Sequence, residues 1–297
     1  QILLIIRFII MNNKSTNDIL IRIADALDRL APSEKKINNL DEGDGFIYDS
    51  KTGLIRPINN INRIPIDLLQ GIMPQKKILL ENTSNFSNNL PANNALLWGA
   101  RGTGKSSLVK SVHAEVLKET SSKCLKLVEI HREDIGDLPE LLYLLSKYPK
   151  YKFILLCDDL SFDAGENTYK SLKAALDGGI EGKPNNVIFY ATSNRRHLMP
   201  RDMMENEKST AINPSESVEE KVSLSDRFGL WIGFHNISQD IYLEIVLAYV
   251  NEYKIPIQKQ KLKAEALEWS ITRGARSGRV AWQFIQDIAG KTKTQII

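Results

Sequence analysis

Cysteine and histidine are scarce in this chain of 297 residues, and their scarcity argues against two kinds of protein. Two cysteines, Cys124 and Cys157, cannot build the disulfide framework of a small secreted domain, so a reducing, cytoplasmic location is expected. Cys157 falls in the apolar run 153–157, which is typical of a small buried side chain. The four histidines are scattered, and none has the spacing to cysteine that a zinc site needs.

Long hydrophobic runs and a strong charge of one sign are also lacking. The apolar run QILLIIRFII at residues 1–10 is much shorter than the roughly 20 residues that cross a bilayer, so no membrane span is expected. Arg7 interrupts it and no small-residue cleavage site follows, which argues against a signal peptide. We expect Met11 to be the natural start and residues 1–10 to be upstream translation; the alternative is a short membrane or partner anchor. A formal net charge of +3 is too small to indicate nucleic acid by itself.

The composition is that of a globular protein, with 42% hydrophobic and 25% charged residues. Apolar strand patterns at 95–98, 125–130, 153–157, 187–192 and 230–234 alternate with helix patterns at 105–118, 138–145 and 169–176. This alternation predicts a parallel sheet covered by helices on both faces. Amphipathic patterns at 241–250, 262–272 and 279–289 then predict a helical domain.

Three parts are therefore expected along the chain. Residues 1–60, broken by the turn-forming sequences DEGDG and SKTG, form an N-terminal accessory segment. Residues 61–237 form an α/β nucleotide-binding domain, in which the polar stretch 201–221 is an exposed insertion. Residues 238–297 form a small helical lid domain.

A complete phosphate-binding motif follows the strand pattern at 95–98. GARGTGKS at residues 99–106 matches G-x-x-x-x-G-K-[ST] at every fixed position, with a strand pattern before it and a helix pattern after it. A glycine-rich turn that binds nothing is the alternative, and these flanking elements disfavour it. Successive backbone N–H groups and the helix N-terminus would face the phosphates of ATP. The predicted nucleotide-binding residues are Gly99, Ala100, Arg101, Gly102, Thr103, Gly104, Lys105, Ser106 and Ser107, with Lys105 on the β- and γ-phosphates and the Ser106 hydroxyl on Mg²⁺.

Two adjacent acids follow another buried strand pattern. FILLCDD at residues 153–159 places Asp158 and Asp159 at the carboxyl end of that strand, where ligands bind in open α/β sheets. Asp158 is expected to hold Mg²⁺, directly or through water, and Asp159 to orient or deprotonate the attacking water. Alone, the pattern would equally fit a strand-ending turn with two solvated acids; beside the phosphate-binding motif it predicts a metal–nucleotide site.

With both motifs placed, the chain resembles the AAA+ ATPases, and more closely an uncharacterised bacterial family of predicted AAA+ ATPases. The resemblance covers about residues 60–290 and is carried by LPANNALLWGARGTGKSSLVK, FILLCDDLSF, IFYATSNRRHL, EEKVSLSDRFGLWIGF and RSGRVAWQFI. It implies an α/β fold of the P-loop NTPase type, a three-layer parallel sheet followed by a helical lid. It also implies Mg-dependent ATP hydrolysis by an assembly of subunits.

The resemblance implies roles for further residues. Asn194 in YATSN matches the sensor-1 residue, which contacts the γ-phosphate or the attacking water. Arg227 in SLSDRFG matches the arginine finger, which acts on the nucleotide of a neighbouring subunit. Arg279 in SGRVAWQF matches the sensor-2 arginine, with Arg276 as the alternative, and Ile72 in LQGI matches the segment that packs on adenine.

Two of these roles have simpler alternatives. Asn194 could be an Asx-turn residue at a strand end. Arg227 could form a surface salt bridge, with Asp226 or Glu220.

Asp159 departs from the pattern of the AAA+ family, which usually has Glu after the metal-binding Asp. Asp is one methylene shorter, so its carboxylate reaches less far toward the water. Asp163 and Glu166 are alternative bases. The departure puts the rate of hydrolysis in doubt, but not the binding of ATP.

The leading function is an ATPase that assembles as a homo-oligomer and remodels or loads an unknown protein or nucleic-acid partner. The alternative is an ATP-dependent switch or binding module with slow or no turnover. The C-terminal cations leave DNA association open, although the sequence contains no helix-turn-helix or zinc module; they are Arg273, Arg276, Arg279, Lys291 and Lys293.

Overall fold

The computed structural model describes residues 18–19, 21–23, 37, 40–119, 124–163, 168–178, 182–196, 198 and 224–296. The chain divides into two compact units, residues 1–36 and residues 37–297. In the first unit, residues 18–19 and 21–23 are helical. Residues 1–10, Glu166 and the polar stretch 201–221 lie outside the described residues.

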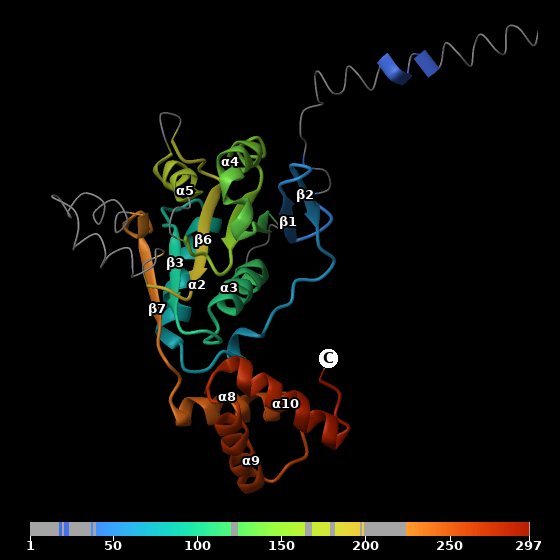
Figure 1. Cartoon of the computed structure of the whole chain (residues 1–297), viewed down its shortest axis with the longest axis vertical. Helices are drawn as coiled ribbons and strands as arrows, with labels where there is room; N and C mark the ends of the chain where they lie inside the picture. Colours follow the sequence, from blue (N-terminus) through green and yellow to red (C-terminus); the bar gives the residue numbers. More distant parts are fainter. Residues whose placement is uncertain are drawn as a thin grey trace, which may run out of the picture. The chain divides into compact units, whose positions relative to one another are not determined.

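A seven-stranded sheet forms the centre of the second unit, in the order β2-β1-β4-β5-β6-β3-β7 (Figure 1). Neighbouring strands are parallel except for β1 and β2, which form an antiparallel hairpin. Strand β6 lies between the strand that leads into the phosphate-binding loop and the strand that ends at the two acids. The strands are β1 (Gly45–Asp49), β2 (Leu54–Pro57), β3 (Ala95–Gly99), β4 (Leu125–Glu129), β5 (Lys152–Cys157), β6 (Val187–Ser193) and β7 (Leu230–Phe234).

Helices cover both faces of the sheet. Leu79 of α2 (Met73–Ser87) and Val112 of α3 (Lys105–Glu119) pack on one face, in a core that includes Ile154. Leu141 of α4 (Leu138–Ser146) and Leu172 of α5 (Thr168–Asp177) pack on the other face. Because the central strands are buried on both faces, they are apolar runs rather than alternating patterns. The short 3₁₀ helices are η1 (Ile66–Leu68) and η2 (Arg132–Asp137).

Three helices form a separate core after the last strand: α8 (Gln239–Glu252), α9 (Lys259–Thr272) and α10 (Gly278–Thr292). Tyr242, Leu262 and Phe284 are buried between them. Serine side chains cap two of these helices: Ser238 accepts from the Ile241 N–H at 3.2 Å, and Ser277 accepts from the Val280 N–H at 3.2 Å. The layered sheet and the helical domain confirm the predicted fold class, an α/β P-loop sheet of the AAA+ type with a helical lid.

The N-terminal boundary of the sheet differs from the one expected. The hairpin of β1 and β2 lies within residues 1–60, yet β1 pairs in parallel with β4 and so belongs to the sheet. The SKTG sequence, interpreted as a breaker, is the hairpin turn, where Gly53 has a φ of 64°. Helix α2 was also not predicted, because its buried positions include the polar residues Lys76, Asn82 and Thr83, which obscure the apolar spacing.

Among the described helices, none combines the length and the apolar character that crossing a bilayer requires.

Candidate functional site

A cavity of about 600 Å³ lies where the phosphate-binding loop, the ends of β5 and β6, and the helical domain meet. Residues 101–107 of the loop line it, together with Asp158, Asp159 and Asn194. From the helical domain it receives Arg279 and the aromatic side chain of Trp282. Residues that the sequence analysis predicted separately are thus brought to one place.

The glycines of the loop allow close approaches of backbone. A Cβ added at Gly99, whose φ is 137°, would lie 1.9 Å from the Phe234 carbonyl oxygen of the neighbouring strand. Gly102 has a φ of 73°, and a Cβ there would lie 2.9 Å from Oγ of Ser277 at the start of α10. The Gly278 N–H also donates to the Gly102 carbonyl at 2.8 Å. The loop therefore contacts the sheet on one side and the helical domain on the other.

Lys105 is almost buried, with 7% of its surface exposed. Its ammonium donates to the carbonyls of Gly99 at 2.8 Å and Ala100 at 2.7 Å. These two predicted residues thus hold the lysine and do not line the cavity. Burial lowers the pKa of Lys105, while Asp158 and Asp159 oppose that effect. Anionic oxygens in the cavity would be stronger acceptors for this ammonium than the neutral carbonyls.

The two acids are held by hydroxyl and amide groups. Oδ1 of Asp158 accepts hydrogen bonds from the hydroxyls of Ser106 and Thr192. Oδ1 of Asp159 accepts from Nδ2 of Asn194, and Oδ1 of Asn194 accepts from the Lys105 ammonium at 3.2 Å. Asn194 thereby connects the lysine of the loop to the second acid.

The oxygen ligands in the cavity suit a magnesium ion that is shared with phosphates. The Ser106 hydroxyl and the Asp158 carboxylate are in direct contact. Mg²⁺ is usually held by one or two carboxylates and by phosphate oxygens of the substrate, rather than by an all-protein cage. The described residues contain no group of three or more His, Cys, Asp and Glu side chains that could hold a metal by itself.

The other half of the cavity is apolar. Ile72, predicted to contact adenine, lines it with Ile237, Tyr249 and Trp282. The ring centroids of Tyr249 and Trp282 are 5.1 Å apart, at an interplanar angle of 54°. The sequence analysis missed both aromatic residues. Trp282 had one available signal, because it follows Arg279 by three positions and so shares its helix face.

The structure distinguishes the two sensor-2 candidates. Arg279 lines the main cavity. Arg276 instead lines a second cavity of about 560 Å³, with Ile271 and Ala275.

Two other predicted residues lie away from the cavity. Nε of Arg227 donates to Oδ1 of Asp177 at 2.6 Å, so the ion pair is with the end of α5 rather than with Asp226. The Asp163 carboxylate pairs with Arg132 at 3.1 Å and with Arg195 at 3.8 Å. Neither Arg227 nor Asp163 lines the cavity.

The C-terminal cations have local partners. Lys291 pairs with Asp287 at 2.6 Å, and the Arg273 guanidinium lies 4.8 Å from the Trp269 ring centroid. With Arg279 in the main cavity, these contacts give no support to a continuous basic surface for DNA.

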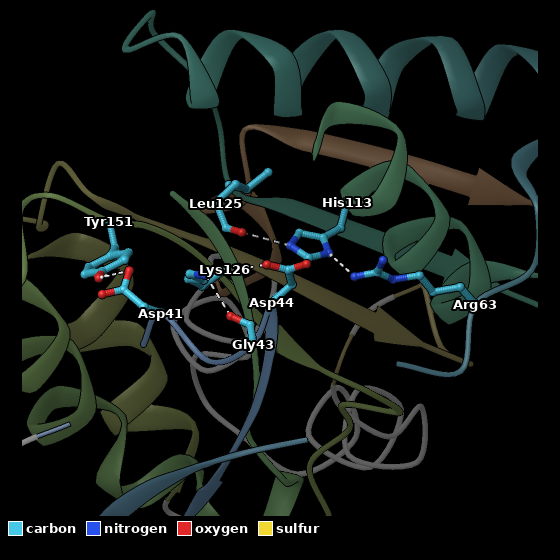
Figure 2. Close-up of polar contacts among 8 residues, drawn as sticks. All are labelled: Asp41, Gly43, Asp44, Arg63, His113, Leu125, Lys126 and Tyr151. Atoms are coloured by element: carbon cyan, nitrogen blue, oxygen red, sulfur yellow. Dashed lines mark hydrogen bonds and ion pairs between the residues drawn. The ribbon is translucent and has the colours of Figure 1, made fainter. Parts of the chain in front are cut away.

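A second polar cluster lies further along α3 (Figure 2). His113 is fully buried; its Nδ1 lies 3.1 Å from Nη2 of Arg63, and its Nε2 lies 3.2 Å from the Leu125 carbonyl oxygen. Because a guanidinium only donates, Nδ1 must accept and the proton must be on Nε2. Burial, helped by the Arg63 charge, lowers the pKa of His113 from 6.5 to about 4.

Lys126 completes this cluster from β4. It is 2% exposed, and its ammonium donates to the Gly43 carbonyl at 2.7 Å and lies 3.5 Å from Asp44 (Figure 2). We call His113, Arg63, Lys126 and Asp44 the closed cluster, since none of them lines either cavity described above.

Comparison with known proteins identifies a family and a related fold. The family described as "Protein of unknown function (DUF815)" matches residues 42–292. Among solved structures, the RuvB Holliday junction branch migration motor of Thermotoga maritima is similar, with 14% identity and a TM-score of 0.46 over 75% of this chain and 71% of that chain. A variant of that protein gives 13% identity and a TM-score of 0.46 over 75% and 72%. A search of the curated proteins found no match.

Proposed function

The chain belongs to the family described as "Protein of unknown function (DUF815)", and from that premise we propose that it is an AAA+ protein that binds and hydrolyses ATP to change a macromolecular partner. One observation carries the proposal. The loop lysine, a serine–aspartate pair and a second acid converge on one cavity, the other half of which is apolar and aromatic.

The residues of the cavity match the parts of Mg-ATP. Lys105, the N–H groups of the loop and Arg279 would hold the phosphates. Ser106 and Asp158 would hold Mg²⁺, which when bound neutralises negative charge on the phosphates. Ile72 and Trp282 would pack on the adenine ring.

Hydrolysis on this site rests on position and charge. Asp159 would orient the attacking water and accept its proton at the carboxylate. Asn194 would keep that carboxylate in place through the hydrogen bond from its amide. Lys105 and Arg279 would stabilise the charge that develops on the phosphate oxygens.

Arg227 supports a homo-oligomer. It pairs with Asp177 outside its own cavity, so we propose that it acts on the nucleotide of the next subunit. A residue that acts in trans needs head-to-tail contacts, which close into rings or continue as helices. The partner of this assembly would be a protein or a nucleic acid, and the low cysteine content favours a reducing, cytoplasmic location.

The test mixes two inactive variants, Lys105→Ala and Arg227→Ala. Each mixed interface of the correct polarity pairs an intact phosphate-binding loop with an intact Arg227. Phosphate release should reappear on mixing and should rise with protein concentration. A mixture that stays inactive while its subunits demonstrably exchange would show that Arg227 does not act in trans.

A second function is favoured by the state of Asp159. It replaces the usual Glu and its carboxylate is hydrogen-bonded to Asn194. The protein could then act as an ATP-dependent switch, in which the bond from Gly278 to Gly102 passes the state of the loop to the helical domain. Single-turnover hydrolysis of pre-bound ATP separates the two functions, because a switch would release its phosphate far more slowly than an assembled motor.

A further inference from the structure

Thr192 occupies a central position beside the two acids. It lies near the carboxyl end of β6, paired in register with Leu97 of the strand that leads into the phosphate-binding loop. On the other side, the last residue pair between β5 and β6 is Cys157 with Ala191, so Thr192 follows directly beside Asp158. It is 1% exposed although it lines the cavity.

Both bonding capacities of the Thr192 hydroxyl are in use. The hydroxyl donates its proton to Oδ1 of Asp158 and accepts the backbone N–H of Asp159 at 3.0 Å. The Thr192 carbonyl also accepts the Leu160 N–H at 2.7 Å. One residue thus holds the side chain of the first acid and the backbone of the second.

The conformation of Asp159 increases the need for such support. Its φ of 52° lies in the left-handed region, which is unfavourable for a residue with a Cβ. The hydrogen bond from its N–H to Thr192 stabilises that turn. The turn in turn places the Asp159 carboxylate where it meets Asn194.

The hydroxyls of Ser106 and Thr192 differ in what they can still do. Both donate to Oδ1 of Asp158, but Thr192 has also accepted a backbone N–H, so its lone pair is less available to a cation. Among residues 40–119, 124–163 and 182–196, Oδ2 of Asp158 has no hydrogen-bond partner. Oδ2 is therefore the oxygen that this arrangement offers to a divalent cation.

We propose that Thr192 is a positioning residue: its hydroxyl orients the Asp158 carboxylate toward Mg²⁺ and holds the backbone of Asp159 in place for hydrolysis. This inference rests on the proposed binding of Mg-ATP. Groups that orient metal ligands in this way typically change metal affinity or activity by about 10- to 100-fold when they are removed.

The experiment replaces Thr192 by Val, which keeps the shape and removes the hydroxyl, and by Ser, which keeps the hydroxyl. Thr83→Val is the matched control, because Thr83 is also fully buried and its hydroxyl also bonds twice, to the Leu79 carbonyl at 2.7 Å and to the Tyr190 hydroxyl at 2.8 Å, without lining the cavity. ATP binding is measured by calorimetry in EDTA and across a Mg²⁺ titration, and phosphate release is measured across the same titration.

Thr192→Val should bind ATP in EDTA like the wild type, and should need about tenfold more Mg²⁺ for half of the magnesium effect on binding and turnover. Thr192→Ser and Thr83→Val should both show the wild-type magnesium dependence. If Thr192→Val does not fold, Thr192→Ala removes the same hydroxyl and takes its place in the comparison.

Two results would overturn the inference in different ways. A wild-type protein that binds no ATP at all would refute the proposed function and this inference with it. A wild-type protein that binds Mg-ATP, beside a folded Thr192→Val with unchanged magnesium dependence or with equal loss of binding in EDTA, would refute the role of Thr192 alone.

Discussion

Helix α3 carries buried polar side chains at two places, and their surroundings differ. At its first residue, Lys105 faces a cavity together with two acids and Asn194. Two turns later, His113 lies in the closed cluster, where Arg63 and the Leu125 carbonyl occupy both ring nitrogens (Figure 2). Burial lowers the pKa of both side chains.

The comparison shows what distinguishes a binding site from structural polarity. Lys105 is bonded to carbonyls that a ligand can replace, and it faces space for that ligand. His113 and Lys126 are bonded to the backbone of other segments, so they join α3 and β4 to the N-terminal part of the sheet. Substitutions in the cavity should therefore change binding or turnover, and substitutions in the closed cluster should change stability.

The largest contrast is expected between two carboxylates. Asp159→Asn keeps an oxygen for the Asn194 amide but removes the proposed base, so ATP binding should persist while phosphate release falls by about 10²- to 10⁴-fold. Asp44→Asn removes a carboxylate from the closed cluster and should leave turnover unchanged. Calorimetry and steady-state phosphate release check both variants. Equal turnover in Asp159→Asn and the wild type would place the base elsewhere; a wild type without measurable turnover would favour the switch.

Two buried lysines give the next contrast. Lys105→Met should lower the affinity for Mg-ATP by about a hundredfold or more, because it removes charge-assisted hydrogen bonds to phosphate. Lys126→Met should leave that affinity unchanged and lower the free energy of unfolding by about 1–3 kcal/mol. Calorimetric titration and urea denaturation separate the effects. Near-native affinity in Lys105→Met would contradict the assignment of the phosphate site.

His113 predicts a dependence of stability on pH. Its pKa is 6.5 in the unfolded chain and about 4 in the folded protein, so the unfolded state takes up the proton first as the pH falls. The contribution to stability is present above pH 6.5 and is lost toward about pH 4, which amounts to about 2 kcal/mol between pH 7 and pH 5. The charges that face the ring are Arg63, Asp44 and Lys126.

The measurement compares urea denaturation of the wild type and of His113→Gln from pH 7 to pH 5. Glutamine keeps one donor and one acceptor but does not titrate, so the variant should lose less stability on acidification. Parallel pH profiles would show that His113 is not the group that responds. ATP binding at pH 7 should be the same in both proteins if the closed cluster is purely structural.

The smallest contrast concerns two tryptophans of the helical domain. Trp282→Ala should lower the affinity for ATP by about tenfold through lost stacking on the base, and should not change the affinity for inorganic triphosphate. Trp269 packs on Phe284 with ring centroids 6.0 Å apart and does not line the cavity, so Trp269→Ala should spare ATP binding. Competition with a fluorescent nucleotide measures both. Equal losses for ATP and triphosphate would show that Trp282 acts through the loop rather than through the base.

The phosphate-binding loop and the two acids could be predicted because each is a contiguous motif with its own local geometry. The loop lies between β3 and α3, and the acids directly follow the buried strand β5. Apolar periodicity predicted the central strands and the three C-terminal helices for the same reason. The hairpin of β1 and β2 and helix α2 escaped prediction because their place depends on pairing and on buried polar side chains rather than on local apolar spacing.

By itself, the sequence determined that this protein has a phosphate-binding loop, a pair of strand-ending acids and a helical domain after the sheet, since these features depend on neighbours along the chain. Only the tertiary structure decided that Arg279 rather than Arg276 meets the main cavity, that Trp282 and Tyr249 form its apolar half, and that Thr192 holds both acids. Those contacts join segments far apart in the chain, and their distances are set by how the strands of the sheet are ordered and how the helical domain packs against the loop.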